Sequence, residues 1–237
     1  MIPDRSLEAA LLGHHQALVG IDEVGRGALA GPVCVGAAVV TPTTAPQIPD
    51  GLRDSKLITA AARPEIAARA RTWVAASAVG SATAAEIDER GIIAALRLAA
   101  SRALAELAES GLAPLPTAAI LDGSHNWLET TLLDSDLPHL DFRQIVVRPK
   151  ADAHCAVVAA ASVIAKTRRD AYMETLEDPG YGFASNKGYG VPGHLAALRA
   201  HGPCDHHRRS WRLAGTGKAL TDTAGTGGAG TTAASMA

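Results

Sequence analysis

Two adjacent carboxylates, Asp22 and Glu23, stand between a short apolar run and the turn Gly25-Arg26-Gly27. Two carboxylates this close raise each other's pKa unless a cation lies between them. Their hard oxygen atoms favour Mg²⁺ or Mn²⁺ over zinc or copper. The glycines admit a close backbone approach, and the arginine offers a planar donor fork to a phosphate. The stretch therefore predicts a site for phosphodiester chemistry.

The strand that would carry these acids spans residues 17–21, which are apolar and bounded by glycines. Because side chains alternate between the faces of a strand, Asp22 and Glu23 cannot both point into one core, and at least one must face a cleft. An exposed hairpin is the alternative interpretation, since Gly31-Pro32 is also typical of a turn. The combination of strand, two acids, Gly-Arg-Gly and a second apolar segment favours the site.

Two further acids follow apolar or turn segments later in the chain. Asp122 ends the apolar run 117–121, where Asp-Gly alone is usually only a turn. If that strand lies parallel to the first and beside it, Asp122 and Asp22 come within reach of one metal ion, because neighbouring strands are only about 4.8 Å apart. Asp152 stands where a helix N-cap would, so capping is its simpler interpretation.

The elements that must position these residues alternate between strands and helices. Strands are predicted at residues 17–23, 31–40, 72–82, 117–121 and 141–147. Helices are predicted at residues 6–16, 60–71, 83–111 with a break at Gly91, 157–170 and 192–201. Thr83 and Glu86 form a capping box, and either Asp54 or Ser55 is a candidate cap for helix 60–71.

The composition predicts a globular protein, with 47% hydrophobic and 19% charged residues in a chain of 237. The net charge of −2 gives no general attraction to nucleic acid, so binding to a polyanion must come from local clusters. Residues 143–170 contain six Lys or Arg and two acids. Residues 187–212 contain five Lys or Arg and one acid. Each cluster is either a phosphate-binding surface or only a solvated face.

Three cysteines, Cys34, Cys155 and Cys204, are far apart and predict reduced thiols in a cytoplasmic protein. The N-terminus lacks the regions of a signal peptide and no apolar run reaches 18 residues, so we expect no membrane segment. His201, Cys204, His206 and His207 are an alternative metal site, although their spacing fits no established zinc pattern. The pattern explains no role for His154 and Cys155.

Residues 19–32 resemble the opening of bacterial ribonuclease HII, the type 2 ribonuclease H family, with Ala28 where proline is usual. Further similar stretches are Asp54-Ser55-Lys56, the segment 150–170, Lys187-Gly188-Tyr189-Gly190 and His207-Arg208-Arg209-Ser210-Trp211. The resemblance runs from about residue 17 to Trp211, which is nearly the whole chain.

This resemblance implies an α/β protein with the ribonuclease H-like fold: a five-stranded mixed sheet flanked by helices, with a C-terminal helical annex. We expect the catalytic domain at residues 1–176 and the annex at 177–213. Residues 214–237 are expected to form a disordered tail, because 18 of the last 23 residues are Gly, Thr or Ala.

The implied activity is that of an endonuclease that hydrolyses the RNA strand of RNA/DNA hybrids. It would also nick duplex DNA 5′ of embedded ribonucleotides, leaving 3′-hydroxyl and 5′-phosphate ends. The resemblance assigns two Mn²⁺ or Mg²⁺ ions to Asp22, Glu23, Asp122 and Asp152. A monomer is expected.

The resemblance also assigns substrate contacts. Gly25, Arg26 and Gly27 would recognise the ribose 2′-hydroxyl, and Tyr189 would stack on the adjoining deoxyribose. Core packing is the alternative interpretation of this tyrosine. Contacts to phosphates are implied for Lys56, Ser162, Lys166 and the C-terminal basic residues. Asp170, at the far end of that helix, is predicted to be structural.

Three alternatives have distinct signatures. Ribonuclease HIII is similar but usually carries Gly-Lys-Gly and an additional N-terminal domain, for which we expect the 21 residues before Asp22 to leave no room. A non-catalytic hybrid-binding module would not require all four acids. A resolvase or transposase on the same fold would lack both Gly-Arg-Gly and Lys-Gly-Tyr-Gly.

Overall fold

A mixed sheet lies at the centre of the computed structural model, which describes residues 2–129 and 142–214. Its order is β3-β2-β1-β4-β5. The strands are β1 (Leu18–Val24), β2 (Val33–Val40), β3 (Ala76–Ala82), β4 (Ala118–Asp122) and β5 (Gln144–Arg148). β2 is antiparallel to β1 and β3, whereas β4 is parallel to β1 and β5. β4 lies parallel to β1 and beside it, which is the condition under which Asp22 and Asp122 were expected to come close.

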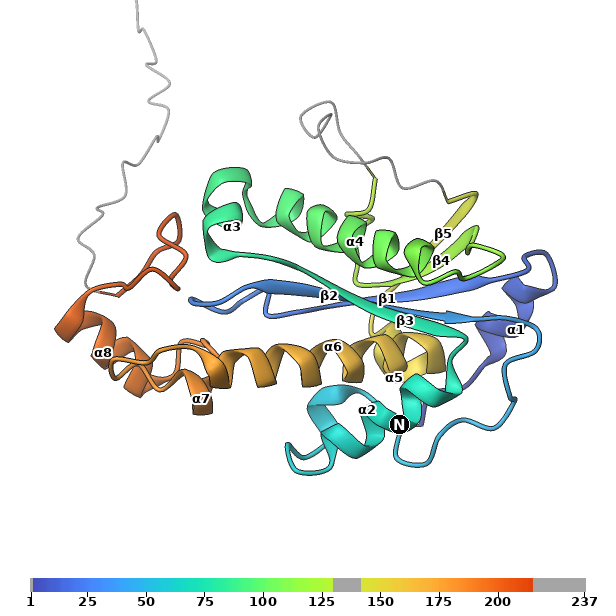
Figure 1. Cartoon of the computed structure of the whole chain (residues 1–237), viewed down its shortest axis with the longest axis horizontal. Coiled ribbons are helices and arrows are strands. Elements are labelled where there is room, and N and C mark those ends of the chain that lie inside the picture. Colours follow the sequence, from blue (N-terminus) through green and yellow to red (C-terminus); the bar gives the residue numbers. More distant parts are fainter. Residues whose placement is uncertain (1, 130–141, 215–237) are drawn as a thin grey trace, which may run out of the picture.

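Helices cover both faces of this sheet (Figure 1). They are α1 (Ser6–Leu12), η1 (Ser55–Leu57), α2 (Arg63–Trp73), α3 (Ala84–Arg90), α4 (Ile92–Glu109), α5 (Ala151–His154), α6 (Ala156–Thr175), α7 (Phe183–Asn186) and α8 (Pro192–His201). The long helix α6 packs on β1 and β2 with α2 outside it, and α4 packs on β3 and β2 from the other side. The predicted five-stranded mixed sheet with flanking helices is therefore confirmed.

The alternation of side chains along β1 divides the core into two layers. Leu18 and Val24 belong to the apolar cluster under α6, whereas Val19 and Ile21 belong to the cluster under α4. Both layers are tight because glycines occupy strand positions that face helices. A Cβ on Gly36 would overlap the carbonyl oxygen of Ala161 on α6.

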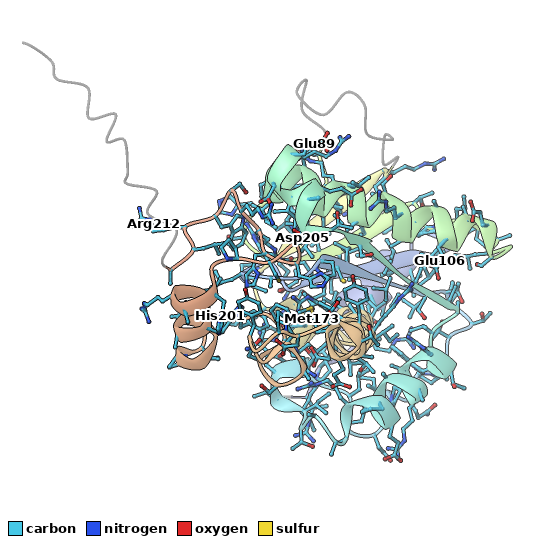
Figure 2. The ribbon with its side chains drawn as sticks, turned by 60° about the vertical axis from the view of Figure 1, so that its left-hand side comes forward. Glu89, Glu106, Met173, His201, Asp205 and Arg212 are labelled. Atoms are coloured by element: carbon cyan, nitrogen blue, oxygen red, sulfur yellow. The ribbon has the colours of Figure 1, made fainter. Side chains whose placement is uncertain are left out.

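The C-terminal segment packs around the far end of α6. A small apolar cluster joins Met173 of α6 to Ala30, Tyr181, Phe183 and Leu198. Figure 2 views the molecule from this end, with Met173 on α6, His201 on α8 and Asp205 on the segment that follows. An antiparallel bridge between Ala30 and His207 then joins this segment to the loop after β1.

Several predicted boundaries shift for local reasons. Helix α2 begins at Arg63 rather than residue 60, because Pro64 is tolerated only in the first turn of a helix. Asp54 does not cap this helix; it caps η1, where its carboxylate accepts from the Lys56 N–H at 2.8 Å. The strand predicted at 72–82 begins at Ala76, since α2 continues to Trp73.

Other boundaries agree more closely. The Thr83–Glu86 capping box is confirmed, and Gly91, with a φ of 78°, separates α3 from α4. The predicted helix 6–16 ends at Leu12, and the predicted helix 157–170 extends to Thr175. Of the strand predicted at 141–147, residue 141 lies outside the described residues, and β5 begins at Gln144. Of the tail predicted at 214–237, only residue 214 is described. Within the described ranges, no helix combines the length and hydropathy that a membrane span requires.

Candidate active site

The cleft at the end of β1 has a volume of about 440 Å³. It is lined by Asp22, Glu23, Val24, Gly25, Arg26, Gly27, Ser55, Lys56, Lys166 and Tyr189. These residues come from segments more than 160 positions apart, and all were predicted for the site except Val24 and Ser55. Ser55 belongs to the Asp-Ser-Lys motif, so its signal was in the sequence. The fold therefore brings the Gly-Arg-Gly turn and Tyr189 to the same cleft as the first two acids.

The register of the sheet explains how the acids are placed. Ile21 pairs with Leu121 on the parallel strand β4, so the next residues, Asp22 within β1 and Asp122 at the end of β4, follow one another on neighbouring strands. Asp22 lies directly across from Gly36 and shares its face, toward α6, whereas Glu23 projects from the opposite face. The prediction that the two adjacent acids point in different directions is borne out, although both line one cleft.

Asp122 and Asp152 lie beside the cleft rather than in its lining. The Asp122 Oδ1 atom accepts from the N–H of Ala151 at 2.6 Å, which ties β4 to α5. Asp152 is not the N-cap of its helix: Lys150 takes that position with a φ of 58°, and Asp152 lies in the first turn of α5. The Lys56 Nζ atom is 3.7 Å from Asp152 Oδ2.

Burial and mutual repulsion dominate the electrostatics of these acids. Asp22 is only 7% exposed, and burial raises its pKa well above the usual range; the other three acids add to this shift and a hydrogen bond from Ser162 opposes it. Burial, with the charges of Asp122 and Asp54, raises the pKa of Asp152 to about 6. Burial also raises the pKa of Glu23. A cation would relieve this repulsion.

The donor set fits a hard divalent cation. The Glu23 Oε2 and Asp152 Oδ2 atoms are buried and have no hydrogen-bond partner among the described residues. In the described ranges, however, no three His, Cys, Asp or Glu side chains are arranged to hold a metal ion as they stand. Glu23 is paired with Arg26 at 3.1 Å, and Asp122 is bonded to a backbone N–H. The residues therefore fit the ion chemically, and ligation requires these side chains to turn.

Ser162 does not face the cleft as a phosphate ligand would. It is 2% exposed, and its hydroxyl is 3.0 Å from the Ser55 hydroxyl. Its position on α6 points toward the sheet and toward Asp22. The predicted phosphate contact is therefore replaced by a contact with the first acid, since this helix face is covered by β1 and η1.

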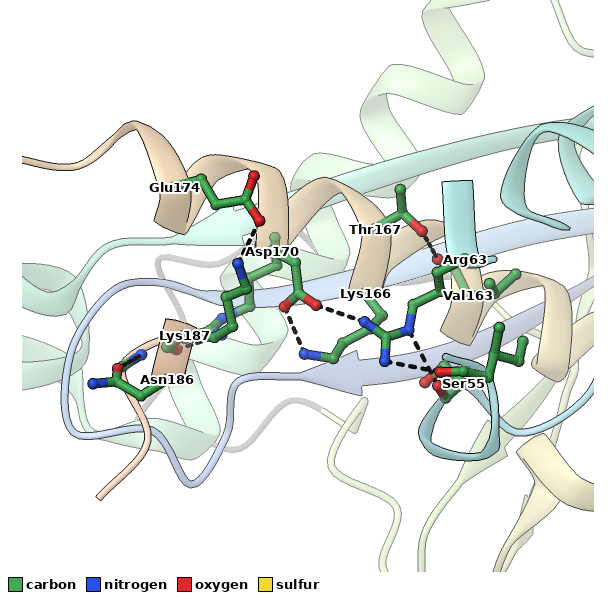
Figure 3. A network of polar contacts seen from close by, with 12 residues as sticks. Ser55, Arg63, Val163, Lys166, Thr167, Asp170, Glu174, Asn186 and Lys187 are labelled. Atoms are coloured by element: carbon green, nitrogen blue, oxygen red, sulfur yellow. Dashed lines mark hydrogen bonds and ion pairs between the residues drawn. The ribbon is translucent and has the colours of Figure 1, made fainter. Parts of the chain in front are cut away.

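Lys166 lines the cleft but is already paired. Its ammonium group binds the Asp170 carboxylate, which also accepts from Arg63 Nη1 at 2.9 Å (Figure 3). Arg63 in turn donates to the Ser55 carbonyl at 3.3 Å. This network connects α2, α6 and η1, in keeping with the structural role predicted for Asp170.

Tyr189 lies in a turn rather than in one of the apolar clusters. Its N–H donates to the Asn186 carbonyl at 3.0 Å, and its half-buried ring lines the cleft. The Lys166 Nζ atom and the Arg169 guanidinium lie 5.9 and 5.6 Å from the ring centroid. Core packing, the alternative interpretation of this tyrosine, is not what the structure shows.

A chain of two hydrogen-bonded histidines supports the Tyr189 turn. His194 Nδ1 donates to the Tyr189 carbonyl at 2.9 Å, so its Nε2 accepts from His207 Nε2 at 2.9 Å. His207 Nδ1 then accepts from the Cys204 N–H at 3.1 Å. Both ring nitrogens of each histidine are therefore occupied by hydrogen bonds. Because these hydrogen bonds occupy both ring nitrogens of His207, the alternative of a zinc site at 201–207 gains no support.

This chain predicts an acid-sensitive contribution to stability. Burial lowers the pKa of His207 to about 4 from 6.5, with His194 adding to the shift. The unfolded state therefore binds more protons between these values, and stability is lost as the pH falls through this window. We expect His207→Gln to be less stable than wild type at pH 7.5, with the difference shrinking by roughly 2–3 kcal/mol at pH 4.5.

Urea unfolding at several pH values measures this difference. The comparison with the variant is required because Asp22 and Asp152 have raised pKa values and act in the opposite direction. Stability curves for the two proteins that run parallel between pH 7.5 and 4.5 would contradict the lowered pKa of His207.

Two arginines of the predicted basic clusters are not available to phosphates. Arg169 and Arg208 are both 0% exposed, and their guanidinium groups bind backbone carbonyls. The prediction that the C-terminal basic residues contact phosphates is therefore wrong for Arg208. Sequence cannot distinguish a buried arginine from a surface one when its partners are carbonyls.

The sheet order, the helices on both faces and the acids on the neighbouring parallel strands β1 and β4 define a hydrolase domain of the ribonuclease H-like class. The chain is similar to ribonuclease H2 from Pyrococcus horikoshii OT3, with a TM-score of 0.61 and 26% identity over 84% of this chain and 95% of that one. It is also similar to Bst-RNase HIII in complex with Mn²⁺, with a TM-score of 0.56 and 25% identity over 81% of this chain and 66% of that one.

The sequence comparisons identify the family. The family model for Ribonuclease HII matches residues 19–214. Ribonuclease HII of Streptomyces coelicolor is 45% identical over 211 residues, which cover 88% of this chain and 81% of the relative. The chain belongs to the ribonuclease HII family and is a hydrolase that cuts the RNA of RNA/DNA hybrids. This family depends on a divalent metal.

Proposed function

We propose that the protein also nicks duplex DNA 5′ of embedded ribonucleotides, by catalysis with two Mn²⁺ or Mg²⁺ ions. The observation that carries this proposal is the shared cleft, where buried acids adjoin a glycine turn and an accessible aromatic ring. A long hybrid presents a ribose at every step. A cleft with one glycine turn and one aromatic ring suits the recognition of a single ribonucleotide.

The four acids would hold the ions, and the charge of each of the other three acts on Asp22. The ligands would be Asp22, Glu23, Asp122 and Asp152. When bound, the ions would supply an activated water and stabilise the leaving 3′-oxygen, so that the products carry 3′-hydroxyl and 5′-phosphate ends. The buried Glu23 Oε2 and Asp152 Oδ2 atoms, which have no hydrogen-bond partner among the described residues, support this assignment. No side-chain nucleophile is required.

Substrate contacts are proposed for the remaining groups that line the cleft. The turn Gly25-Arg26-Gly27 would recognise the 2′-hydroxyl, and Tyr189 would stack on the adjoining deoxyribose. Lys56, whose side chain is 78% exposed, and Lys166 would contact phosphates. The annex at 177–213 would hold Tyr189 in place as part of the same domain. A cytoplasmic monomer remains the prediction, and the free thiols of the three cysteines support that compartment.

A nicking assay tests the proposal. The substrates are a DNA duplex with one ribonucleotide, an all-DNA duplex and a long RNA/DNA hybrid, each with Mg²⁺, Mn²⁺ or EDTA. We expect a single nick 5′ of the ribonucleotide and no cleavage of the all-DNA duplex. EDTA should abolish both this nicking and the cleavage of the hybrid. Cleavage of the hybrid without cleavage at the single ribonucleotide would overturn the proposal while leaving the family's activity intact.

Gly27→Ala tests the recognition turn directly. A Cβ at Gly27 would meet no atom within 4 Å, so it would project into the open cleft. We expect an unchanged Tm but a fall of about tenfold in kcat/KM on the single-ribonucleotide duplex, because the methyl group keeps the ribose from the backbone. At Gly25, which has a φ of 81° and packs against Arg169, the same change should lower the Tm. Wild-type kcat/KM for Gly27→Ala would exclude this contact.

A further inference from the structure

Arg208 holds the recognition turn from behind. Its Nη2 atom donates to the Gly25 carbonyl at 2.6 Å and to the Gly31 carbonyl at 3.1 Å, and its Nη1 atom donates to the Arg26 carbonyl at 2.8 Å. Its own N–H donates to the Leu29 carbonyl at 2.9 Å. One fully buried side chain therefore spans both ends of the loop between β1 and β2.

Arg169 joins the same loop to the Tyr189 turn. From α6, its Nε atom donates to the Pro32 carbonyl at 2.9 Å, and its Nη1 atom donates to the Lys187 carbonyl at 3.0 Å. Its guanidinium also lies over the Tyr189 ring and against the α-carbon of Gly25. Through Arg169, the two elements proposed to contact the ribonucleotide share one fixed point.

Neither arginine has a carboxylate partner within ion-pair distance among the described residues. A buried guanidinium is costly without compensation, and here the compensation comes only from carbonyl dipoles and aromatic faces, including Trp211 at 4.8 Å from Arg208. Because both guanidinium groups bind carbonyls of the 25–32 loop rather than a carboxylate, they act directly on the conformation of that loop.

The direction of these carbonyls has a geometric consequence. In a trans peptide the C=O of one residue and the N–H of the next point in opposite directions. Since Arg208 draws the carbonyls of Gly25 and Arg26 toward the core, the N–H groups of Arg26 and Gly27 point away from it, toward the cleft that these residues line. Among the described residues, neither N–H has a hydrogen-bond acceptor.

We propose that Arg169 and Arg208 form a guanidinium clamp that aims two backbone N–H groups at the substrate ribose and fixes them relative to Tyr189. The clamp rests on the proposed recognition of a single ribonucleotide. These arginines are positioning residues: they determine selectivity for the 2′-hydroxyl without touching the substrate.

Binding measurements in EDTA test the clamp apart from catalysis. For Arg208→Gln we expect the ratio of affinities for the single-ribonucleotide and all-DNA duplexes to fall about tenfold, with all-DNA affinity unchanged. Arg208→Lys keeps the charge but supplies fewer donors, and should recover part of the ratio. Arg71→Gln, on the exposed face of α2, is the matched control and should equal wild type.

Hydrogen exchange provides a readout that does not depend on substrate. In both Arg169→Gln and Arg208→Lys we expect faster exchange in the 25–31 loop. Arg169→Gln should also exchange faster in the 187–190 turn. The rest of the exchange pattern should match wild type in both variants. If wild type shows no preference for the ribonucleotide duplex, the proposed function fails and exchange alone decides on the clamp. Unchanged exchange in both segments would overturn the clamp. Where wild type prefers the ribonucleotide duplex, an unchanged affinity ratio in a folded Arg208→Gln protein would also overturn it.

Discussion

Asp22→Asn should abolish cleavage while leaving the fold and hybrid binding intact. The carboxylate is buried on β1, and the charges of the three other acids all raise its pKa. Asparagine keeps the shape and one oxygen but loses the negative charge that a shared cation requires. We expect a loss of at least about 10³-fold in kcat, equivalent to about 4 kcal/mol.

Stability gives a second readout on the same variant. A carboxyl group whose folded pKa is raised contributes stability at low pH and loses it as the pH rises through the folded pKa. Replacing Asp22 by a neutral amide removes that loss, so the Tm at pH 8 should equal or exceed the wild-type value. Asp205→Asn, an exposed acid on the annex, is the control and should cleave normally. Full cleavage by Asp22→Asn would refute its role as a metal ligand.

Gly36→Val should destabilise the protein by at least about 3 kcal/mol, which lowers the Tm by roughly 6–12 °C. Gly36 lies on β2 directly across from Asp22, and its missing side chain lets α6 approach the sheet. A Cβ here would overlap the Ala161 carbonyl oxygen and lie 2.9 Å from the Ala165 Cβ. Because both atoms belong to a rigid helix, the helix must move away from the strand.

Thermal unfolding and activity together check this prediction. Displacement of α6 should also separate Ser162 from Asp22, so kcat should fall in the folded fraction. The control is Gly193→Ala in α8, where a Cβ meets no atom within 4 Å and helix propensity favours alanine. The control should be as stable as wild type or slightly more so. A wild-type Tm for Gly36→Val would show that the helix does not depend on this contact.

Periodicity and strand ends were enough to predict the central part of the site. Alternation in β1 predicted that Asp22 and Glu23 diverge, and the apolar run before Asp122 predicted a strand, which the structure places parallel to β1 and beside it. Both inferences need only local sequence and the spacing of strands. The resemblance to a family supplied Tyr189, whose position in the cleft depends on contacts far along the chain.

The errors share a different physical cause. Ser162, Arg169 and Arg208 have polar side chains that sequence reasoning placed at the surface or on phosphates. Their burial depends on partners more than 100 residues away: the Ser55 hydroxyl for the serine and the carbonyls of the 25–32 loop for the arginines. Spacing within a helix or loop carries no information about such partners. Capping, the simpler interpretation of Asp152, also failed, because Lys150 with its positive φ takes the N-cap position and Asp152 lies in the first turn of α5.

The bridge between Ala30 and His207 has a consequence for biosynthesis. A nascent chain that has left the ribosome only as far as α8 already contains all four acids and every strand of the sheet. It still lacks the partner that closes the loop beside those acids, because residues 206–208 are translated last of all the elements around the cleft. A chain interrupted before this point would contain all four acids but would lack the Arg208 side chain that binds the carbonyls of Gly25 and Arg26.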